Sequence, residues 1–159
     1  EIEYRKYTLI YMRKIFYAIG AMSGTSADGI DISLIRTDGL NYFKPLESIS
    51  ISFDSFLKKE ILSFSREFQN KKNHFKLLEI EGMITEKYIL AIEKILAKSK
   101  LKSSHISVLG LHGQTVFHDP KNRISLQLIN SSKIAKYFNI KTISDFREND
   151  ILKGGEEHL

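Results

Sequence analysis

The chain has 159 residues, which suffices for one domain with a hydrophobic core of its own. Hydrophobic residues make up 42% and charged residues 27%, which excludes an intrinsically disordered chain, and the lack of cysteine excludes disulfides and thiolate metal sites. The net charge of +5 is dispersed instead of forming one basic stripe, and no apolar stretch approaches the ~20 residues that span a bilayer, so we expect a cytoplasmic protein with no membrane or nucleic-acid partner.

Three β-prone runs come first among the predicted elements. Residues 14–21 and 30–35 are rich in β-branched and aromatic side chains, and a turn of small and polar residues separates them. After a second turn signal at Asp38-Gly39, residues 49–53 alternate apolar side chains with serine. The pattern predicts three consecutive antiparallel strands.

Helices and further strands follow. Asp54 offers a side-chain oxygen to cap a helix that continues to about Phe68, and apolar residues at helical spacing predict a longer helix over 74–100. The remaining expected elements are a strand over 106–111, a turn at 119–122, a strand over 124–129, a helix over 133–138 and a strand over 141–144. This order predicts an α/β domain: a mixed sheet with three antiparallel strands first and helices packed on it.

The turn between the first two strands has a composition suited to phosphate. In Ser23-Gly-Thr-Ser-Ala-Asp-Gly-Ile-Asp31, small residues let the backbone approach a ligand, and backbone N–H groups and hydroxyls can donate to phosphate oxygens. Asp28 or Asp31 is suited to holding a hydrated Mg²⁺. The alternative is a hairpin turn with polar decoration, because the sequence has neither a Walker-type lysine nor a following helix here.

A second polar stretch begins at the end of the strand expected over 106–111, where ligands of open α/β sheets tend to bind. It is Gly110-Leu-His-Gly-Gln-Thr-Val-Phe-His118. Its hydrogen-bonding groups suit a sugar, and they belong to His112, Gln114, Thr115 and His118. The alternative is a metal site of His112, His118 and Asp119, although the spacing of the two histidines matches no common zinc pattern.

A third stretch follows the last expected strand and consists of Ser144-Asp-Phe-Arg-Glu-Asn-Asp150 with the pair Gly154-Gly155 after it. Asp145 is suited to act as a base or to accept a sugar hydroxyl, and the planar fork of Arg147 is suited to an anion. The alternative is a surface ion pair of Arg147 with Asp145 or Asp150.

Together these stretches are similar to the anhydro-N-acetylmuramic acid kinases of bacterial cell-wall recycling. Residues 22–31 resemble the opening signature of that family. Further family motifs recur in the same order and spacing: His112-Gly-Gln-Thr115 with His118, Leu126-Gln127, Asp145-Phe-Arg147, Asp150 and Gly154-Gly155. The resemblance covers about residues 16–155.

The resemblance implies a ribonuclease-H-like domain of the actin-like ATPase fold, the first of two such domains that close over ATP and substrate. We expect residues 12–155 to form this N-terminal domain and residues 1–11 to be a non-native or disordered leader. The second domain is expected to be absent. Whole members of the family are expected to form homodimers, which leaves the oligomeric state of this chain open.

The resemblance also implies a reaction with ATP and Mg²⁺ as cofactors. ATP phosphorylates the 6-oxygen of 1,6-anhydro-N-acetylmuramic acid while water opens the anhydro bridge, which gives N-acetylmuramic acid 6-phosphate. The implied contacts to the nucleotide phosphates are Gly24, Thr25, Ser26, Ala27, Asp28, Gly29, Ile30 and Asp31. We expect the anhydro amino sugar to contact His112, Gln114, Thr115, Asp145 and Arg147.

Departures from the family pattern bear on catalysis. After the glycine pair the family continues with Gln-Gly-Ala-Pro-Leu, whereas this chain has Glu156-Glu-His-Leu159. The aspartate that takes the proton from water in the family lies in a Phe-Asp-x-Gly-Pro-Gly-Asn stretch that this sequence does not contain, so we assign no catalytic residue. We expect a truncated kinase, and the alternative is an inactive remnant or phosphate-binding module, or one half of a split kinase.

Overall fold

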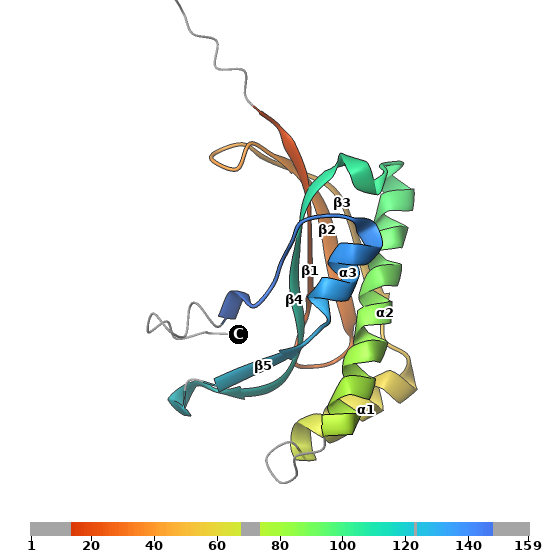
Figure 1. Ribbon diagram of the computed structural model, residues 1–159, viewed down its shortest axis with the longest axis vertical. Helices are drawn as coiled ribbons and strands as arrows, with labels where there is room; N and C mark the ends of the chain where they lie inside the picture. Colours follow the sequence, from red (N-terminus) through yellow and green to blue (C-terminus); the bar gives the residue numbers. More distant parts are fainter. Residues whose placement is uncertain (1–13, 68–73, 123, 148–159) are drawn as a thin grey trace, which may run out of the picture.

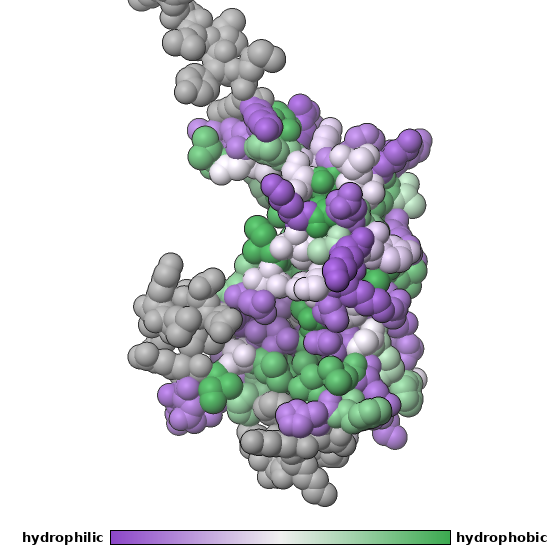
Figure 2. All heavy atoms as spheres, in the orientation of Figure 1, coloured by the Kyte–Doolittle hydropathy of each residue, from purple (hydrophilic) through white to green (hydrophobic). Residues whose placement is uncertain are grey.

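The computed structural model describes residues 14–67, 74–122 and 124–147. These contain one sheet and three α-helices, arranged as shown in Figure 1. The expected leader, the end of the first helix at Phe68, and the positions Asp150 and Gly154-Gly155 lie outside the described residues. No helix in the described ranges is long and apolar enough to cross a membrane. On the face of the molecule seen in Figure 2, hydrophilic residues lie interspersed with hydrophobic ones.

The sheet begins with the three antiparallel strands that the sequence predicts. They are β1 (Phe16–Ser23), β2 (Gly29–Thr37) and β3 (Phe43–Ser52). The fourth strand, β4 (Ile106–Asp119), pairs in parallel with β1, and the remaining strands, β5 (Ile124–Leu128) and β6 (Thr142–Ile143), both pair with β4. The main path through the sheet is β3-β2-β1-β4-β5, so the sheet is mixed, as expected.

The three helices lie on the same side of the sheet in Figure 1. They are α1 (Ser55–Glu67), α2 (His74–Ser99) and α3 (Ser131–Phe138). The predicted cap of α1 is confirmed, because the Asp54 carboxylate accepts a hydrogen bond of 2.9 Å from the backbone N–H of Leu57. The third helix begins two residues earlier than expected, since the Asn130 side chain caps it by accepting from Lys133 N. It ends at Phe138, and the next residue, Asn139, caps it with a left-handed φ of 54°.

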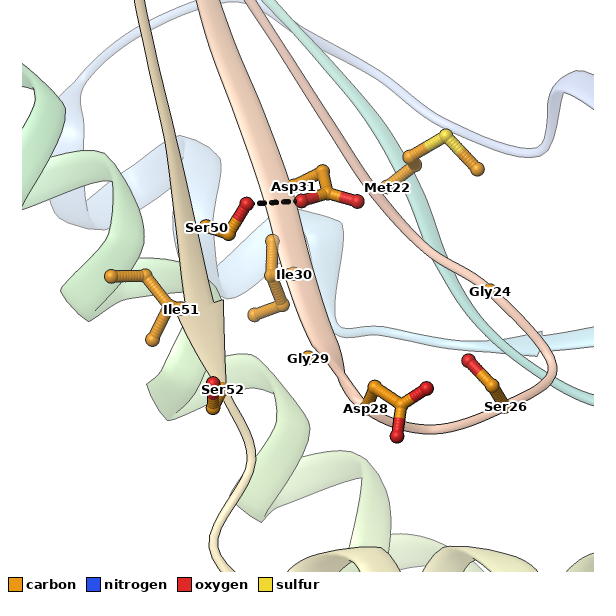
Figure 3. A pocket seen from close by; sticks show the side chains of 10 residues that line it. All are labelled: Met22, Gly24, Ser26, Asp28, Gly29, Ile30, Asp31, Ser50, Ile51 and Ser52. Atoms are coloured by element: carbon orange, nitrogen blue, oxygen red, sulfur yellow. Dashed lines mark hydrogen bonds between the residues drawn. The ribbon is translucent and has the colours of Figure 1, made fainter.

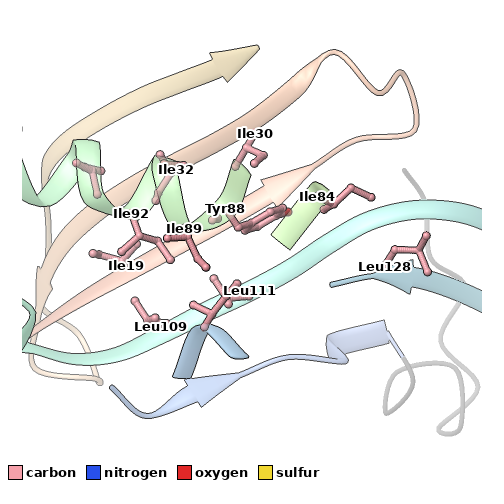
Figure 4. Packing of buried hydrophobic residues seen from close by; sticks show 14 of the residues in the cluster. Ile19, Ile30, Ile32, Ile84, Tyr88, Ile89, Ile92, Leu109, Leu111 and Leu128 are labelled. Atoms are coloured by element: carbon pink, nitrogen blue, oxygen red, sulfur yellow. The ribbon is translucent and has the colours of Figure 1, made fainter. Parts of the chain in front are cut away.

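Alternation along the strands explains why the helices cover only one face. Ile19, Ala21 and Ser23 of β1 are buried while Gly20 and Met22 between them are exposed, and β2 alternates in a similar way. The inward side chains of the sheet pack against the apolar stripe of α2, seen in Figure 4, which includes Ile84, Tyr88 and Ile92. The face that carries Gly20 and Met22 is therefore open to ligands or to other parts of the chain.

The strand β4 is longer than the sequence predicts. We expected it to end at Leu111, but it continues to Asp119, so the polar stretch 110–118 lies within a strand instead of following one. The structure accommodates this by a bulge: Leu111 pairs with Ala21 but Gln114 pairs with Ser23, which leaves one extra residue in β4. Gly113 supplies the φ of +80° that the bulge requires, and β5 then pairs with the extension.

Candidate functional site

The loop between β1 and β2 forms one wall of an open pocket of about 300 Å³. Figure 3 shows the loop curving around the ends of the two strands, with the end of β3 on the other side. The lining residues are Met22, Gly24, Ser26, Asp28, Gly29, Ile30, Asp31, Ser50, Ile51 and Ser52. The pocket lies at the carboxyl end of β1, the edge of the sheet at which ligands of α/β folds bind.

Backbone hydrogen bonds hold this loop in a tight turn. Ala27 N donates to Gly24 O at 3.1 Å, and Ala27 is fully buried with a left-handed φ of 51°. A left-handed residue within a tight turn directs neighbouring backbone N–H groups into one concave space, which is the arrangement that binds anions. The left-handed residue is thus one feature that this turn shares with backbone sites for anions.

Gly29, the first residue of β2, occupies a position with no room for a side chain. A Cβ added to Gly29 would lie 2.2 Å from the carbonyl oxygen of Ile51 and 2.8 Å from Ser52 Cα. Both atoms belong to the backbone of β3 and cannot move aside as a flexible side chain would. Glycine is thus what allows β2 and β3 to approach each other at the floor of the pocket.

Two carboxylates at the pocket are held in different ways. The Asp28 carboxylate forms an ion pair with Lys58 of α1, and hydrogen bonds from Lys58 and then Ser26 lower the pKa of Asp28. Asp31, on β2, accepts a hydrogen bond of 2.5 Å from the hydroxyl of Ser50 on the neighbouring strand, as Figure 3 shows. Both carboxylates belong to exposed residues, so they are accessible to a hydrated cation.

Most of the residues predicted to contact phosphate come together at this pocket. Six of the eight line it, whereas Thr25 is exposed without lining it and Ala27 is buried beneath the turn. Sequence reasoning missed the serines of β3 and the lysine of α1. The serines were visible as the polar half of the alternating run 49–53, but only the strand register shows that this half faces Asp31.

Gln114 lies behind the loop and is completely buried. Its Nε2 donates to the carbonyl oxygens of Gly24 at 2.8 Å and Thr115 at 3.0 Å. Its Oε1 accepts from the Ser23 hydroxyl at 2.5 Å, and the same hydroxyl lies 2.6 Å from Gly29 O. The amide that was expected to contact a sugar is therefore engaged by Ser23 and Gly24, where β1 passes into the loop.

The other predicted sugar contacts lie apart from the loop. His112 Nε2 accepts a hydrogen bond of 2.9 Å from Arg147 Nε, and its Nδ1 lies 3.1 Å from Gly113 O, which fixes the neutral tautomer protonated at Nδ1. Thr115 is buried, and Asp145 is exposed and accepts from the Ser144 hydroxyl at 3.0 Å. The structure thus brings two of the five predicted residues into contact on the open face of the sheet, and Arg147 is itself buried there, with 8% of its surface exposed.

The alternative metal site receives no support from the described parts of the chain. Within residues 14–67, 74–122 and 124–147, no three histidine or carboxylate side chains gather closely enough to hold a metal ion. His118 instead lies 3.2 Å from the Ser125 hydroxyl, and Asp119 accepts from Asn122.

Comparison with known proteins agrees with the motifs found at this pocket. Residues 16–157 match the family model for anhydro-N-acetylmuramic acid kinase. The chain belongs to the anhydro-N-acetylmuramic acid kinase family. The match includes the phosphate-suited loop, the second polar stretch on β4 and the residues Asp145 to Arg147, which are the regions where the sequence resembles this family.

Curated members of the anhydro-N-acetylmuramic acid kinase family are similar over most of this chain. The kinase from Sulfurimonas denitrificans is 39% identical over 143 residues, which is 89% of this chain and 38% of that protein. The kinase from Rhizobium johnstonii is 35% identical over 87% of this chain and 38% of its own length. The kinase from Pelagibacter ubique is 30% identical over 91% of this chain and 39% of its own length. The chain thus spans about two-fifths of the length of these relatives.

The family membership and the observed sheet agree with the α/β, ribonuclease-H-like fold that the resemblance implied. A solved structure of the Aquifex aeolicus PPX-GPPA enzyme is also similar, covering 82% of this chain and 36% of its own, with a TM-score of 0.33 and 6% identity. A likeness of this size adds no weight to the assignment.

Proposed function

We propose that this chain provides the nucleotide-phosphate-binding part of an anhydro-N-acetylmuramic acid kinase, in which the loop and strand residues 24–31 contact the phosphates of Mg-ATP. The observation that carries the proposal is the convergence of six of these residues on one pocket beneath a turn with a left-handed residue. Such a turn presents backbone N–H groups to an anion without further rearrangement.

The chemistry of the pocket fits a phosphate chain with its cation. The backbone of the turn would supply donors, while Asp31 supplies a carboxylate beside them. Mg²⁺ is usually bound through one or two carboxylates together with phosphate oxygens, and when bound it would neutralise charge on the transferred phosphoryl group. Asp28 is the less suited of the two carboxylates for the cation, because Lys58 already compensates its charge.

The sugar would be bound on the open face of the sheet in this proposal. His112 and Arg147 lie there in contact with each other, and Arg147 has the planar fork that recognises carboxylates such as the lactyl group of a muramic acid. We assign no residue of this chain as the proton acceptor, because the family stretch that carries it is not in the sequence. The chain therefore supplies binding and positioning, and the kinase reaction needs residues in addition to these.

Calorimetric titration with MgATP and MgADP tests the proposal directly. We expect saturable binding to the wild-type chain and a loss of about tenfold or more in affinity for Asp31→Ala, because charge-assisted contacts contribute about 1.5–3 kcal/mol. The variant Asp119→Ala, whose carboxylate lies away from the pocket at the β4–β5 turn, serves as the matched control. Absence of nucleotide binding by the wild-type chain would contradict the proposal.

A second assay separates binding from catalysis. ADP release and product mass are measured with the purified chain, ATP, Mg²⁺ and 1,6-anhydro-N-acetylmuramic acid. Binding without turnover is the expected result, and it would fit a phosphate-binding module or one half of a split kinase. Turnover that is lost in Asp31→Ala would show that a residue of this chain, with Asp145 as the first candidate, acts as the base.

A further inference from the structure

Gln114 is a polar side chain that reaches no solvent. It lies in β4 with none of its surface exposed, although an uncharged amide without partners would cost free energy in such a place. Its contacts offset this cost: one goes to Ser23 at the end of β1, one to Gly24 in the loop that follows, and one to the neighbouring Thr115. Residues 90 positions apart in the chain are joined by the bond from its Nε2 to Gly24 O.

The chemistry of the contacts requires an amide. On one side, the carbonyl oxygens of Gly24 and Thr115 need a donor, and Nε2 offers two N–H groups. On the other side, Oε1 of the amide accepts a hydrogen bond from the Ser23 hydroxyl. Turning the amide around would place Oε1 against two carbonyl oxygens, so the observed orientation is the favourable one. The single proton of the Ser23 hydroxyl is shared between two nearby acceptors, Gln114 Oε1 and Gly29 O.

The bulge in β4 aims Gln114 at the loop. In a regular strand, residue 113 would share a face with Leu111 and Gln114 would point to the opposite face. The extra residue moves Gln114 to the position opposite Ser23, on the inner side of the sheet. Only glycine suits the extra position, because at Gly113 φ is +80° and a Cβ would lie 3.0 Å from Ile129 Cγ2.

We propose that Gln114 is a positioning residue of the phosphate loop and not a contact of the sugar. By binding Gly24 O, the amide holds the carbonyl group that also closes the turn to Ala27 N. By binding Ser23, it holds the point at which β1 enters the loop. The inference rests on the proposed function only where it concerns nucleotide affinity, since the contacts themselves do not depend on a ligand.

The backbone conformation of this loop needs support from its surroundings. A left-handed φ at Ala27 is an unfavourable backbone conformation for a residue with a Cβ and persists only where the surroundings impose it. The backbone N–H groups bind an anion well only if they are already directed at it before the ligand arrives. Gln114 supplies that constraint from beneath, on the side away from the pocket, so it leaves the pocket itself open.

The test compares Gln114→Met with the wild-type chain. Methionine has a similar volume and suits a buried position, but it offers neither the donor nor the acceptor. Gln114→Glu is the second variant, which keeps the shape and removes the amide donors. Asn130→Ala is the control, because it removes the cap of α3 and lowers overall stability without touching the loop.

Two measurements are made on each variant: amide hydrogen exchange of residues 24–28 and calorimetric affinity for MgADP. We expect exchange in the loop to become about tenfold to a hundredfold faster in both Gln114 variants while amides in the middle of α2 stay protected, and affinity for MgADP to fall by a similar factor. Asn130→Ala should leave the loop exchange and the affinity close to those of the wild type.

Each result decides the matter. Unchanged loop exchange in both Gln114 variants would overturn the inference, and so would equal acceleration in the loop and in α2, since that would show a general effect on stability. If loop exchange accelerates selectively but the wild-type chain binds no MgADP, the positioning role stands and the proposed function fails. If loop exchange accelerates while MgADP affinity is unchanged, Gln114 orders the loop without serving phosphate binding, and the inference is overturned.

Discussion

Replacing Gly29 by alanine should separate β2 from β3 at the floor of the pocket. The new Cβ would lie 2.2 Å from Ile51 O, more than 1 Å inside the 3.4 Å at which ordinary contact begins. Relief requires the strands to move apart, which breaks the hydrogen bond of 2.9 Å from Phe53 N to Asp28 O. Losing that bond costs about 1 kcal/mol and the overpacking about 1–3 kcal/mol, so the free energy of unfolding should fall by about 2–4 kcal/mol.

Thermal unfolding followed by circular dichroism measures this effect. For a domain of this size, a loss of 1 kcal/mol lowers Tm by about 2–4 °C, so Gly29→Ala should lower Tm by about 5–15 °C. The matched control is Gly20→Ala, on the adjacent strand β1, where an added Cβ meets nothing within 4 Å. A Tm for Gly29→Ala equal to that for Gly20→Ala would refute the close approach of the two strands.

Three further predictions concern charge and packing. Lys58→Met should raise the pKa of Asp28 toward its ordinary value of 3.8, as followed by carboxyl NMR titration, because the bond to Lys58 is the main cause of its lowering. Hydrogen bonds from the Leu57 N–H and then from Lys87 lower the pKa of Asp54 in the folded state. The carboxylate therefore stabilises the fold fully above pH 3.8, and this contribution is lost as the pH falls through the lower folded pKa. Asp54→Asn should consequently weaken the dependence of the free energy of unfolding on acid pH. Ile92→Ala, at a fully buried position in α2, should lower the free energy of unfolding in denaturant by about 2–5 kcal/mol.

The sequence predicted well those elements whose signals are local. Three strands, the cap at Asp54 and the long helix that begins at His74 were all expected, because alternation, capping and helical spacing act between near neighbours. The turn expected between the first two strands is confirmed as the loop 24–28, while residues 29–31 already belong to β2. That its residue types favour phosphate binding stays a prediction.

The features that were missed depend on contacts between distant residues. The extension of β4 to Asp119 follows from pairing with β5, which no pattern within 110–118 reveals. The ion pair of Asp28 with Lys58 joins residues 30 positions apart, and the burial of Gln114 depends on a bulge that only the register with β1 defines. On sequence alone, Gln114 was one more hydrogen-bonding side chain in a polar stretch.

The bulge at Gly113 also directs two side chains of one short motif to opposite faces of the sheet. His112 and Gln114 are two positions apart and would share a face in a regular strand, but the first contacts Arg147 on the open face and the second contacts the loop on the inner face. The two side chains share no described partner. The effects of substitutions at the two positions on the free energy of unfolding should therefore be additive. A coupling energy near zero in a double-mutant cycle would show that these two residues of one motif act independently.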